Sequence, residues 1–342
     1  MAIYILYLFG NKKMVKKAEI KNLKYNHMKK ILLILLALVS GLHAIAQQDE
    51  HYTMYFFNTL VQNPGYAGSR EVISLVGLYR TQWTGIEGSP KTMSLSIHSP
   101  MRNDKVGLGL NIVNDQLSVT NTTRVTGDYA YRIPVGNNGG KLAIGIQASL
   151  LNLTNNLSKL STTVGNDPSL VNVKNLLLPN VGAGLYYYTQ KMYLGLSMPH
   201  MINFKLDKRE VASSATSDSL ARQFTHLFGT AGIVLPLSKD IKLKPALMAK
   251  YVPGNNIFGA PPSLDINVSA LLKEALWLGA SYRTGDSYDF IVGYQFNKQL
   301  RAAYAYDLTR TELSRVAEGS HEIMLGYDFN FDRSRVVTPR YF

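Results

Sequence analysis

Apolar and polar side chains alternate along most of this chain, in one segment after another from about residue 72 onward. The stretch 264–270 (LDINVSA) is an example, and the same alternation returns in residues 288–296 and 323–331. Successive side chains of a strand point to opposite faces, so each segment predicts a strand with one apolar and one polar face. Segments of about 9–12 residues are long enough for a tilted strand to cross a bilayer. The sequence therefore predicts an all-β fold, a transmembrane antiparallel β-barrel.

The alternation marks about fourteen strands, and an even number is usual for a bacterial single-chain barrel. They are expected at 72–80, 91–99, 105–114, 121–133, 141–151, 180–189, 191–199, 223–235, 241–251, 263–273, 275–283, 287–297, 299–308 and 320–332. The connections between them alternate in length. The longer ones include 81–90, 152–179, 200–222, 252–262 and 309–319, and the shorter ones include 100–104, 134–140 and tight turns near Gln190, Glu274 and Lys298. Outer-membrane barrels have short periplasmic turns and longer extracellular loops, so we expect both termini in the periplasm.

The two faces of the strands predict two kinds of surroundings. Tyrosines near strand ends are expected to form aromatic bands at the membrane interfaces, although strands favour tyrosine in any case. These are Tyr129, Tyr131, Tyr187, Tyr282, Tyr304 and Tyr306. Charged residues on the polar faces are expected in the lumen, mostly in structural salt bridges rather than in contacts with a partner. They are Arg124, Asp128, Arg132, Lys242, Lys244, Lys250, Arg283, Arg301, Asp307, Glu322 and Asp328.

The first 46 residues have the features of a leader. Lysines precede an apolar run at 31–42, and Ala44-Ile45-Ala46 follows it. The run is shorter than the roughly 20 residues of a membrane-spanning helix, so the pattern indicates a secretory signal peptide. We expect cleavage after Ala46, a signal peptide over 28–46 and an over-extended start over 1–27. The mature chain would then comprise a periplasmic or plug segment at 47–71, the barrel at 72–332 and a periplasmic tail at 333–342, in the outer membrane.

The composition argues against several other functions. Much of the formal net charge of +13 comes from lysines of the leader, and no basic stripe of the kind that binds nucleic acid remains. The chain has no cysteine, and its seven histidines are dispersed without metal-ligand spacing. It also has no Gly-x-Ser-x-Gly motif and no phosphate-binding glycine loop. We expect no enzyme activity, no metal and no cofactor.

Two segments outside the strands are distinctive. Residues 56–68 (FFNTLVQNPGYAG) combine aromatic residues with turn signals just before the first strand, and they could fill the lumen or cover the lower rim. Residues 80–92 (RTQWTGIEGSPKT) form the first outer hairpin, with one of the two tryptophans of the chain. Tryptophan and arginine are frequent at protein interfaces, but a hairpin that packs its own tryptophan explains the pattern equally well.

These segments, together with the C-terminal sequence, resemble the PorP/SprF family of Bacteroidota outer-membrane proteins of type IX secretion and gliding motility. The matching blocks are YFFN at 55–58, NPGYAG at 63–68, the hairpin pattern R-x-QW-x-GIEGSPKT at 80–92 and PRYF at 339–342. The resemblance spans essentially the whole mature chain. The family usually has a proline after the Phe-Asn pair and an alanine before the tyrosine, where this chain has Thr59 and Gly65.

The resemblance implies a barrel that serves protein export and surface anchoring, by binding the C-terminal sorting domain of a cognate secreted protein. Two alternatives remain: a core type IX component that docks the periplasmic ring lipoproteins, and a passive porin or hydrophobic-solute channel. The expected partners are the secreted protein and outer-membrane lipid, with the ring lipoproteins of the secretion system as further candidates. The candidate partner-binding residues are Arg80, Gln82, Trp83, Gly85, Glu87 and Pro90 of the hairpin, and Pro339, Arg340, Tyr341 and Phe342 of the tail.

Overall fold

The computed structural model describes residues 50–102, 104–136, 139–159, 172–207, 219–223, 225–253 and 262–329. All of them belong to one compact unit. The predicted leader, its cleavage after Ala46 and the tail at 333–342 lie outside the described residues, so the domain boundaries remain predictions.

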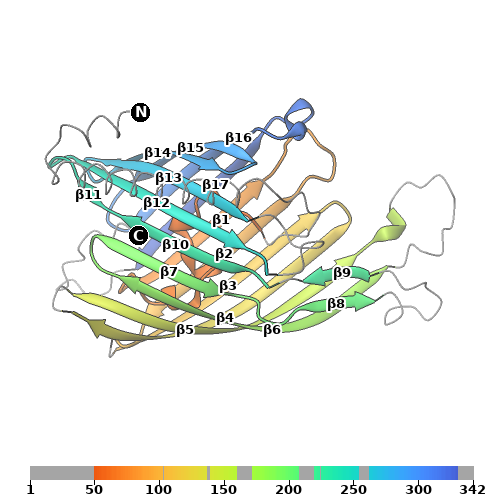
Figure 1. The fold of residues 1–342 in the computed structure, drawn as a ribbon, viewed down its shortest axis with the longest axis horizontal. Helices are drawn as coiled ribbons and strands as arrows, with labels where there is room; N and C mark the ends of the chain where they lie inside the picture. The colour runs from red at the N-terminus through yellow and green to blue at the C-terminus, as the bar shows by residue number, and fades with distance from the viewer. Residues whose placement is uncertain are drawn as a thin grey trace, which may run out of the picture. The chain divides into compact units, whose positions relative to one another are not determined.

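Fourteen antiparallel strands form a closed ring, which confirms the predicted barrel (Figure 1). Each strand of the ring pairs with the ring strands that precede and follow it along the chain, and the ring closes where β17 pairs with β1. The strands of the ring are β1 (Ile73–Thr81), β2 (Lys91–Pro100), β3 (Val106–Leu117), β4 (Thr120–Val135), β5 (Gly140–Asn155), β6 (Val173–Tyr188), β7 (Met192–Met198), β10 (Leu227–Ile233), β12 (Ile241–Tyr251), β13 (Ser263–Leu272), β14 (Leu276–Arg283), β15 (Ser287–Gln295), β16 (Leu300–Thr309) and β17 (Ser320–Phe329). A two-residue strand, β11 (Leu235–Pro236), pairs with β12 beyond the end of β10.

The connections divide the barrel into two ends. The long-loop end carries the connections 82–90, 156–172, 199–226, 252–262 and 310–319, with two tight turns at 118–119 and 284–286. The short-turn end carries only brief connections, at 101–105, 136–139, 189–191, 237–240, 273–275 and 296–299. The predicted alternation of connection lengths is therefore confirmed, apart from the two tight turns at the long-loop end.

Two predicted loops contain strands. β6 begins at Val173 rather than near residue 180, because a run of three leucines at 176–178 hides its alternation. Asn175 has a φ of 51°, and the register of β6 against β5 shifts nearby, between Leu153 and Asn155. The predicted loop 200–222 contains a separate hairpin, β8 (Phe204–Asp207) with β9 (Ser219–Gln223). This hairpin continues the β7–β10 pair beyond the barrel wall (Figure 1).

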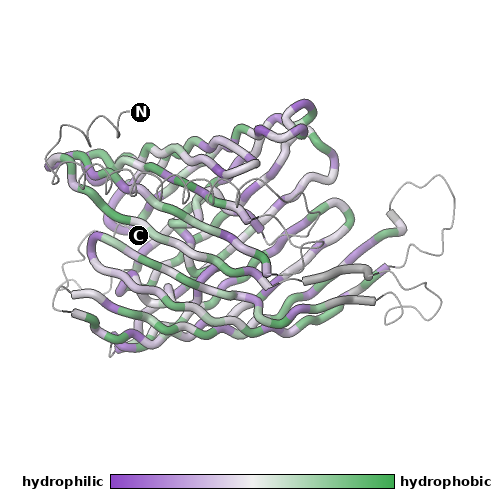
Figure 2. Tube along the Cα trace, in the orientation of Figure 1, coloured by the Kyte–Doolittle hydropathy of each residue, from purple (hydrophilic) through white to green (hydrophobic). Residues whose placement is uncertain are grey.

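Side chains alternate across the barrel wall as the sequence pattern predicts. In β2, Thr92, Ser94, Ser96 and His98 are buried in the interior, whereas the intervening residues 93, 95 and 97 are exposed and apolar. Figure 2 shows the same alternation as polar and apolar bands along the strands. The charged residues predicted for the lumen lie on the inward side of their strands. The barrel thus has an apolar outer surface and a polar interior, as in outer-membrane barrels.

Aromatic residues on the outer surface form two bands. All six tyrosines predicted for these bands face outward. The band nearer the long-loop end includes Tyr79, Tyr251, Tyr282, Tyr288, Tyr304 and Tyr306, and the band nearer the short-turn end includes Tyr129, Tyr131, Tyr187, Tyr294 and Phe296. Within the described chain there is no helix whose length and hydrophobicity would suit it to cross a membrane.

The wall is uneven in height. β4, β5 and β6 each have 16 residues, whereas β7 and β10 each have 7. On the outward face, exposed Leu150 gives way to polar Asn152 two residues further along β5. In the neighbouring strands, Asn114 Nδ2 donates hydrogen bonds to Asn121 Oδ1 and Thr123 Oγ1, both at 2.8 Å. Outward polar groups of this kind indicate that the additional length of β4–β6 extends beyond the apolar surface at the long-loop end.

Candidate functional site

The barrel interior contains the chain that precedes β1. Residues 50–70, here called the inner segment, form three short 3₁₀ turns: η1 (Tyr55–Phe57), η2 (Thr59–Val61) and η3 (Pro64–Tyr66). Nearly every residue from Tyr52 to Ser69 is buried, although the segment belongs to no sheet. Figure 1 shows it in orange among the strands.

The inner segment runs along the barrel from the long-loop end to the short-turn end. Its first residues contact strand ends beside the long loops, its middle contacts β7 and the parts of β5 and β6 nearer the short turns, and its end reaches the short turns. In chain order, Glu50 pairs with Arg124 (3.3 Å), Thr53 with Asp307 (2.7 Å), Asn63 Nδ2 donates to the Leu185 carbonyl (3.0 Å), and Arg70 pairs with Asp328 (2.7 Å). Glu50 and Phe329, the first and last described residues, therefore lie at opposite ends of the barrel. The expectation that both termini are periplasmic concerns residues outside the described chain and remains a prediction.

A buried ionic cluster holds the start of the inner segment, and we call it the upper cluster. Arg80 forms ion pairs with Asp307 (2.7 Å) and Glu322 (3.0 Å), and all three side chains are at most 2% exposed. The two Glu322 oxygens accept the backbone N–H groups of Thr53 (2.9 Å) and Met54 (2.8 Å). The Thr53 hydroxyl donates to the Asp307 carboxylate and accepts from Arg80 at 2.9 Å. Each charge in this cluster therefore has several partners, as a buried charge requires.

A second cluster, here called the lower cluster, holds the other end of the segment. The Asp328 carboxylate pairs with Arg70 at 2.7 Å and with Arg301 at 2.8 Å, and it accepts a hydrogen bond from the Ser74 hydroxyl at 2.7 Å. Burial alone would lower the pKa of Arg70, but the adjacent Asp328 carboxylate raises it above its usual value. The guanidinium of Arg70 therefore stays charged.

His51 lies near the upper cluster, with its Nε2 atom 3.3 Å from Lys250 Nζ. Burial lowers the pKa of His51 well below its usual value, and the positive charges of Lys250, Arg283 and Arg80 lower it further. The ring is therefore neutral near pH 7.

Glycines on the inner wall provide space for the middle of the inner segment. A Cβ at Gly145 would overlap Gly65 N and Pro64 C, and a Cβ at Gly184 would overlap the Asn63 side chain. A Cβ at Gly107 would overlap the Ala67 carbonyl. The backbone of residues 63–68 therefore lies directly against β3, β5 and β6, which only residues without a side chain allow.

The Asn-Pro-Gly-Tyr-Ala-Gly sequence itself is explained by this docking. The Asn63 side chain accepts the Gly65 N–H at 2.9 Å, which fixes the turn that starts η3. Gly68 ends the docked stretch with a φ of 72°, donates its N–H to His98 Nδ1 at 3.0 Å, and accepts a hydrogen bond from Arg132 through its carbonyl. His98 thus accepts a backbone hydrogen bond in the lumen.

Aromatic contacts hold Phe56 and Phe57 against β12 and β14, near the short-turn ends of these strands. Lys244 Nζ lies 4.9 Å from the ring centre of Phe56, 5.9 Å from that of Phe57 and 5.3 Å from that of Trp277. Phe57 and Trp277 also make an edge-to-face contact at 5.7 Å. Cation–π contacts of this kind stabilise a lysine inside an otherwise aromatic environment.

The hairpin between β1 and β2 forms part of the rim at the long-loop end. Thr84 N donates to the Gly319 carbonyl at 2.8 Å, and Glu318 N donates to the Thr84 carbonyl at 2.7 Å. Ser118 N donates to the Gly88 carbonyl at 2.8 Å. The hairpin is therefore a rigid element, joined to the loop 310–319 on one side and to the β3–β4 turn on the other.

The family of the chain follows from a comparison with models of known families. Residues 44–327 match the family described as type IX secretion system membrane protein PorP/SprF. This chain belongs to the PorP/SprF family. The match covers the inner segment, the hairpin and nearly all of the barrel, so the PorP/SprF resemblance seen in the sequence is confirmed. A search of curated proteins finds no match.

Solved structures similar to this PorP/SprF barrel are outer-membrane proteins of low sequence identity. The toluene transporter TbuX of Ralstonia pickettii is 11% identical, with a TM-score of 0.46 over 80% of this chain and 93% of the other. The KdgM porin is 12% identical, with a TM-score of 0.37 over 75% and 99%. The outer membrane protein Omp33 of Acinetobacter baumannii is 8% identical, with a TM-score of 0.39 over 76% and 98%. None of them bears on what this chain binds or transports.

The candidate partner-binding residues of this PorP/SprF chain lie in different surroundings. Arg80 is 1% exposed, inside the upper cluster, so its observed contacts are within the barrel. Gly85 and Glu87 are exposed on the hairpin, and Gln82, Trp83 and Pro90 are half-buried in it. The other four candidates, Pro339, Arg340, Tyr341 and Phe342, lie outside the described residues. The assignment of all ten to partner binding remains a prediction.

The sequence left open where the inner segment lies, because residues 56–68 could either fill the lumen or cover the lower rim. Gly107, Gly145 and Gly184 all lie against residues 63–68, a common contact that the strand alternation does not predict. A signal was present, because these glycines occupy inward positions of nearby strands, opposite a turn-rich segment that no strand pattern explains.

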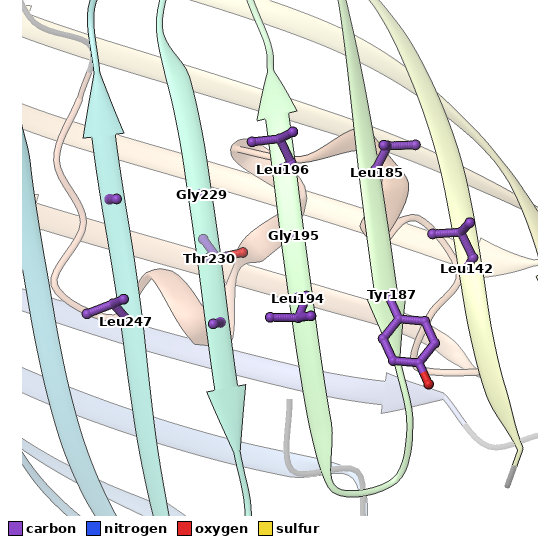
Figure 3. A pocket seen from close by; sticks show the side chains of 11 residues that line it. Leu142, Leu185, Tyr187, Leu194, Gly195, Leu196, Gly229, Thr230 and Leu247 are labelled. Atoms are coloured by element: carbon purple, nitrogen blue, oxygen red, sulfur yellow. The ribbon is translucent and has the colours of Figure 1, made fainter. Parts of the chain in front are cut away.

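A shallow apolar depression lies on the outer surface, over β5, β6, β7, β10 and β12 (Figure 3). It exists because Gly229, Ala231 and Ala249 are small, while Leu194, Leu196 and Leu247 rise around them. Its walls are almost wholly apolar and belong to the membrane-facing surface, so it offers no groups for catalysis. Among the described residues no group of histidine and acidic side chains has the arrangement of a metal site.

Proposed function

We propose that this PorP/SprF barrel supports the export and surface anchoring of a cognate secreted protein, by binding its C-terminal sorting domain. Membership of a type IX secretion membrane family supports a role in protein export rather than in nutrient uptake. The barrel would reach the outer membrane with a cleavable signal peptide. No catalytic step and no cofactor are part of the proposal.

The observation that carries the proposal is the filled lumen. A passive porin needs a continuous aqueous path, and 14-stranded barrels are wide enough to hold one. Here the inner segment occupies the interior along its length, with ionic clusters at both ends. A filled barrel favours a docking scaffold over a channel.

The rim at the long-loop end is the surface that suits a large protein partner. It presents the rigid hairpin at 82–90 and the edge of the β8–β9 pair, beyond the membrane-facing part of the wall. Extended partner segments commonly bind exposed strand edges through main-chain hydrogen bonds. Exposed Glu87 and the half-buried Trp83 would contact the partner from the hairpin.

Affinity purification of the tagged barrel from its native outer membrane, followed by mass spectrometry, tests the proposal. We expect one large secreted protein with a type IX sorting domain to co-purify. Recovery of periplasmic ring lipoproteins alone would instead identify a core component of the secretion machine. A barrel recovered without partners, together with an open, ohmic conductance in planar bilayers, would identify a porin.

The tail at 333–342 offers a complementary test. We expect its deletion to leave barrel assembly intact but to weaken docking to periplasmic components. If the truncated protein fails to insert, the tail belongs to the folding signal and not to a binding site.

A further inference from the structure

The upper and lower clusters share one arrangement. Each joins the inner segment to the same three strands, β1, β16 and β17. The upper cluster uses Arg80, Asp307 and Glu322, and the lower cluster uses Ser74, Arg301 and Asp328. The seam where β1 meets β17 closes the barrel. The inner segment is therefore tied across the closing seam at both ends of the barrel.

The contacts make seam closure and the docking of the segment depend on each other. Without the inner segment, the Glu322 carboxylate would lose the two backbone N–H groups that it accepts, and Asp307 would lose the Thr53 hydroxyl. Without closure, Arg80 on β1 would be separated from both carboxylates. A buried carboxylate that loses donors is destabilised, so the docked segment and the closed seam stabilise each other.

The chain connection also couples docking of the inner segment to the pairing of β1 with β17. Arg70, in the lower cluster, lies three residues before Ile73, the first residue of β1. β1 therefore brings the segment with it when it pairs with β17, and the glycines on β3, β5 and β6 make room for residues 63–68 away from the seam.

We infer that the inner segment is a built-in closure element, which docks as β1 pairs with β17 and then stays fixed while the barrel works. The lumen is then a sealed core, and the exported protein does not pass through it. This inference rests on the proposed function only where it concerns the exported protein, because the closure role concerns the barrel alone.

The closure role is tested by the assembly of variants at the seam. We expect Glu322→Ala and Asp328→Ala each to lower the fraction of heat-resistant, folded barrel in the outer membrane at least several-fold. The matched control is Asp128→Ala, which removes a buried carboxylate that accepts from Asn111 on β3, away from the seam. Equal losses in all three variants would overturn the closure role, since any buried carboxylate would then have the same effect.

The fixed position of the segment is tested with a disulfide, which the absence of native cysteine makes simple. Asn58 Nδ2 lies 3.3 Å from Ser94 Oγ on β2, so the Asn58→Cys/Ser94→Cys pair locks the segment to the wall. We expect the oxidised double variant to export and display the partner as well as either single variant does. Export that stops on oxidation and returns on reduction would show that the segment must move.

A conductance measurement covers the case in which the disulfide does not form. The purified wild-type barrel is expected to stay closed in planar bilayers, and a barrel that opens reversibly without unfolding would overturn the fixed seal. If the wild-type barrel captures no secreted protein, the proposed function is wrong. The assembly of the seam variants and the conductance of the barrel still test whether the inner segment is a fixed closure element.

Discussion

Gly145 shows how a single missing side chain can position a whole segment. Its Cα lies against the backbone of Pro64 and Gly65, and any Cβ there would overlap backbone atoms rather than a flexible side chain. Glycine is thus required at this position for steric reasons, on a strand where its β-propensity is poor.

We expect Gly145→Val to lift the inner segment from the wall and lower the unfolding temperature of the barrel. Overpacking typically lowers the free energy of unfolding by about 1–3 kcal/mol. We expect a cost at the upper end of this range, because the overlapping atoms belong to the backbone and cannot rotate away as a side chain can. Heat-modifiable mobility on gels, measured over a temperature series, detects the change. Gly127→Val is the matched control, because a Cβ at Gly127 meets nothing within 4 Å. An equal effect of both substitutions would contradict the docking argument.

His51 predicts a pH dependence of stability. Its folded pKa lies below the unfolded value of about 6.5, so the unfolded chain binds the proton more readily. The barrel is therefore expected to lose stability as the pH falls below about 6.5, since protonation would place a cation beside Lys250, Arg283, Arg80 and His226. We expect His51→Gln to flatten this part of the profile, measured as the unfolding temperature between pH 8 and pH 5. Parallel profiles for the variant and the wild type would assign the pH dependence to other groups.

At the scale of elements, the strands were predictable because burial on one face imposes a period of two. β12 (Ile241–Tyr251) matches its predicted range completely, and most other strands differ by a few residues at their ends. β6 was predicted too short because Leu176, Leu177 and Leu178 break the alternation locally. The β8–β9 hairpin was missed because its short strands carry no clear period.

The inner segment could not be placed from sequence for a different reason. Its partners are remote in the chain: Thr53 contacts Asp307 and Glu322, which lie 254 and 269 residues further on. Strand periodicity shows which residues face the lumen, but it does not show which of them meet across it. Arg80 was for this reason grouped with the hairpin residues next to it, whereas its side chain lies within the interior.

The hairpin at 82–90 is the element on which the partner prediction depends. Gly85 has a φ of 92°, a backbone conformation that residues with a side chain rarely adopt, and a Cβ there would meet the Val316 carbonyl and the Glu318 side chain of the neighbouring loop. We expect Gly85→Ala to distort the hairpin and reduce the amount of co-purified secreted protein several-fold, without loss of folded barrel. Gly285→Ala is the control, because Gly285 also has positive φ but its Cβ would meet nothing within 4 Å. Normal partner recovery with Gly85→Ala would argue against binding at the hairpin.

At the scale of the whole molecule, the division into a long-loop end and a short-turn end predicts the orientation in the membrane. Glu87 is exposed at the long-loop end and Lys298 at the short-turn end. Since the chain has no cysteine, single Glu87→Cys and Lys298→Cys variants can be labelled selectively. We expect a membrane-impermeant maleimide to label the first variant on intact cells and the second only after the outer membrane is opened. The reverse pattern would place the long loops in the periplasm.

The uneven wall has a consequence for any large body that approaches the long-loop end. At about 3.3 Å per residue, β4–β6 extend over about 53 Å, whereas β7 and β10 extend over about 23 Å. Across the ring from β5 stands β15, with nine residues. The taller strands therefore act as a one-sided barrier, and steric access is directional. A large partner protein can approach the long-loop end along the membrane plane from the β14–β15 side. From the opposite side it would collide with β4–β6.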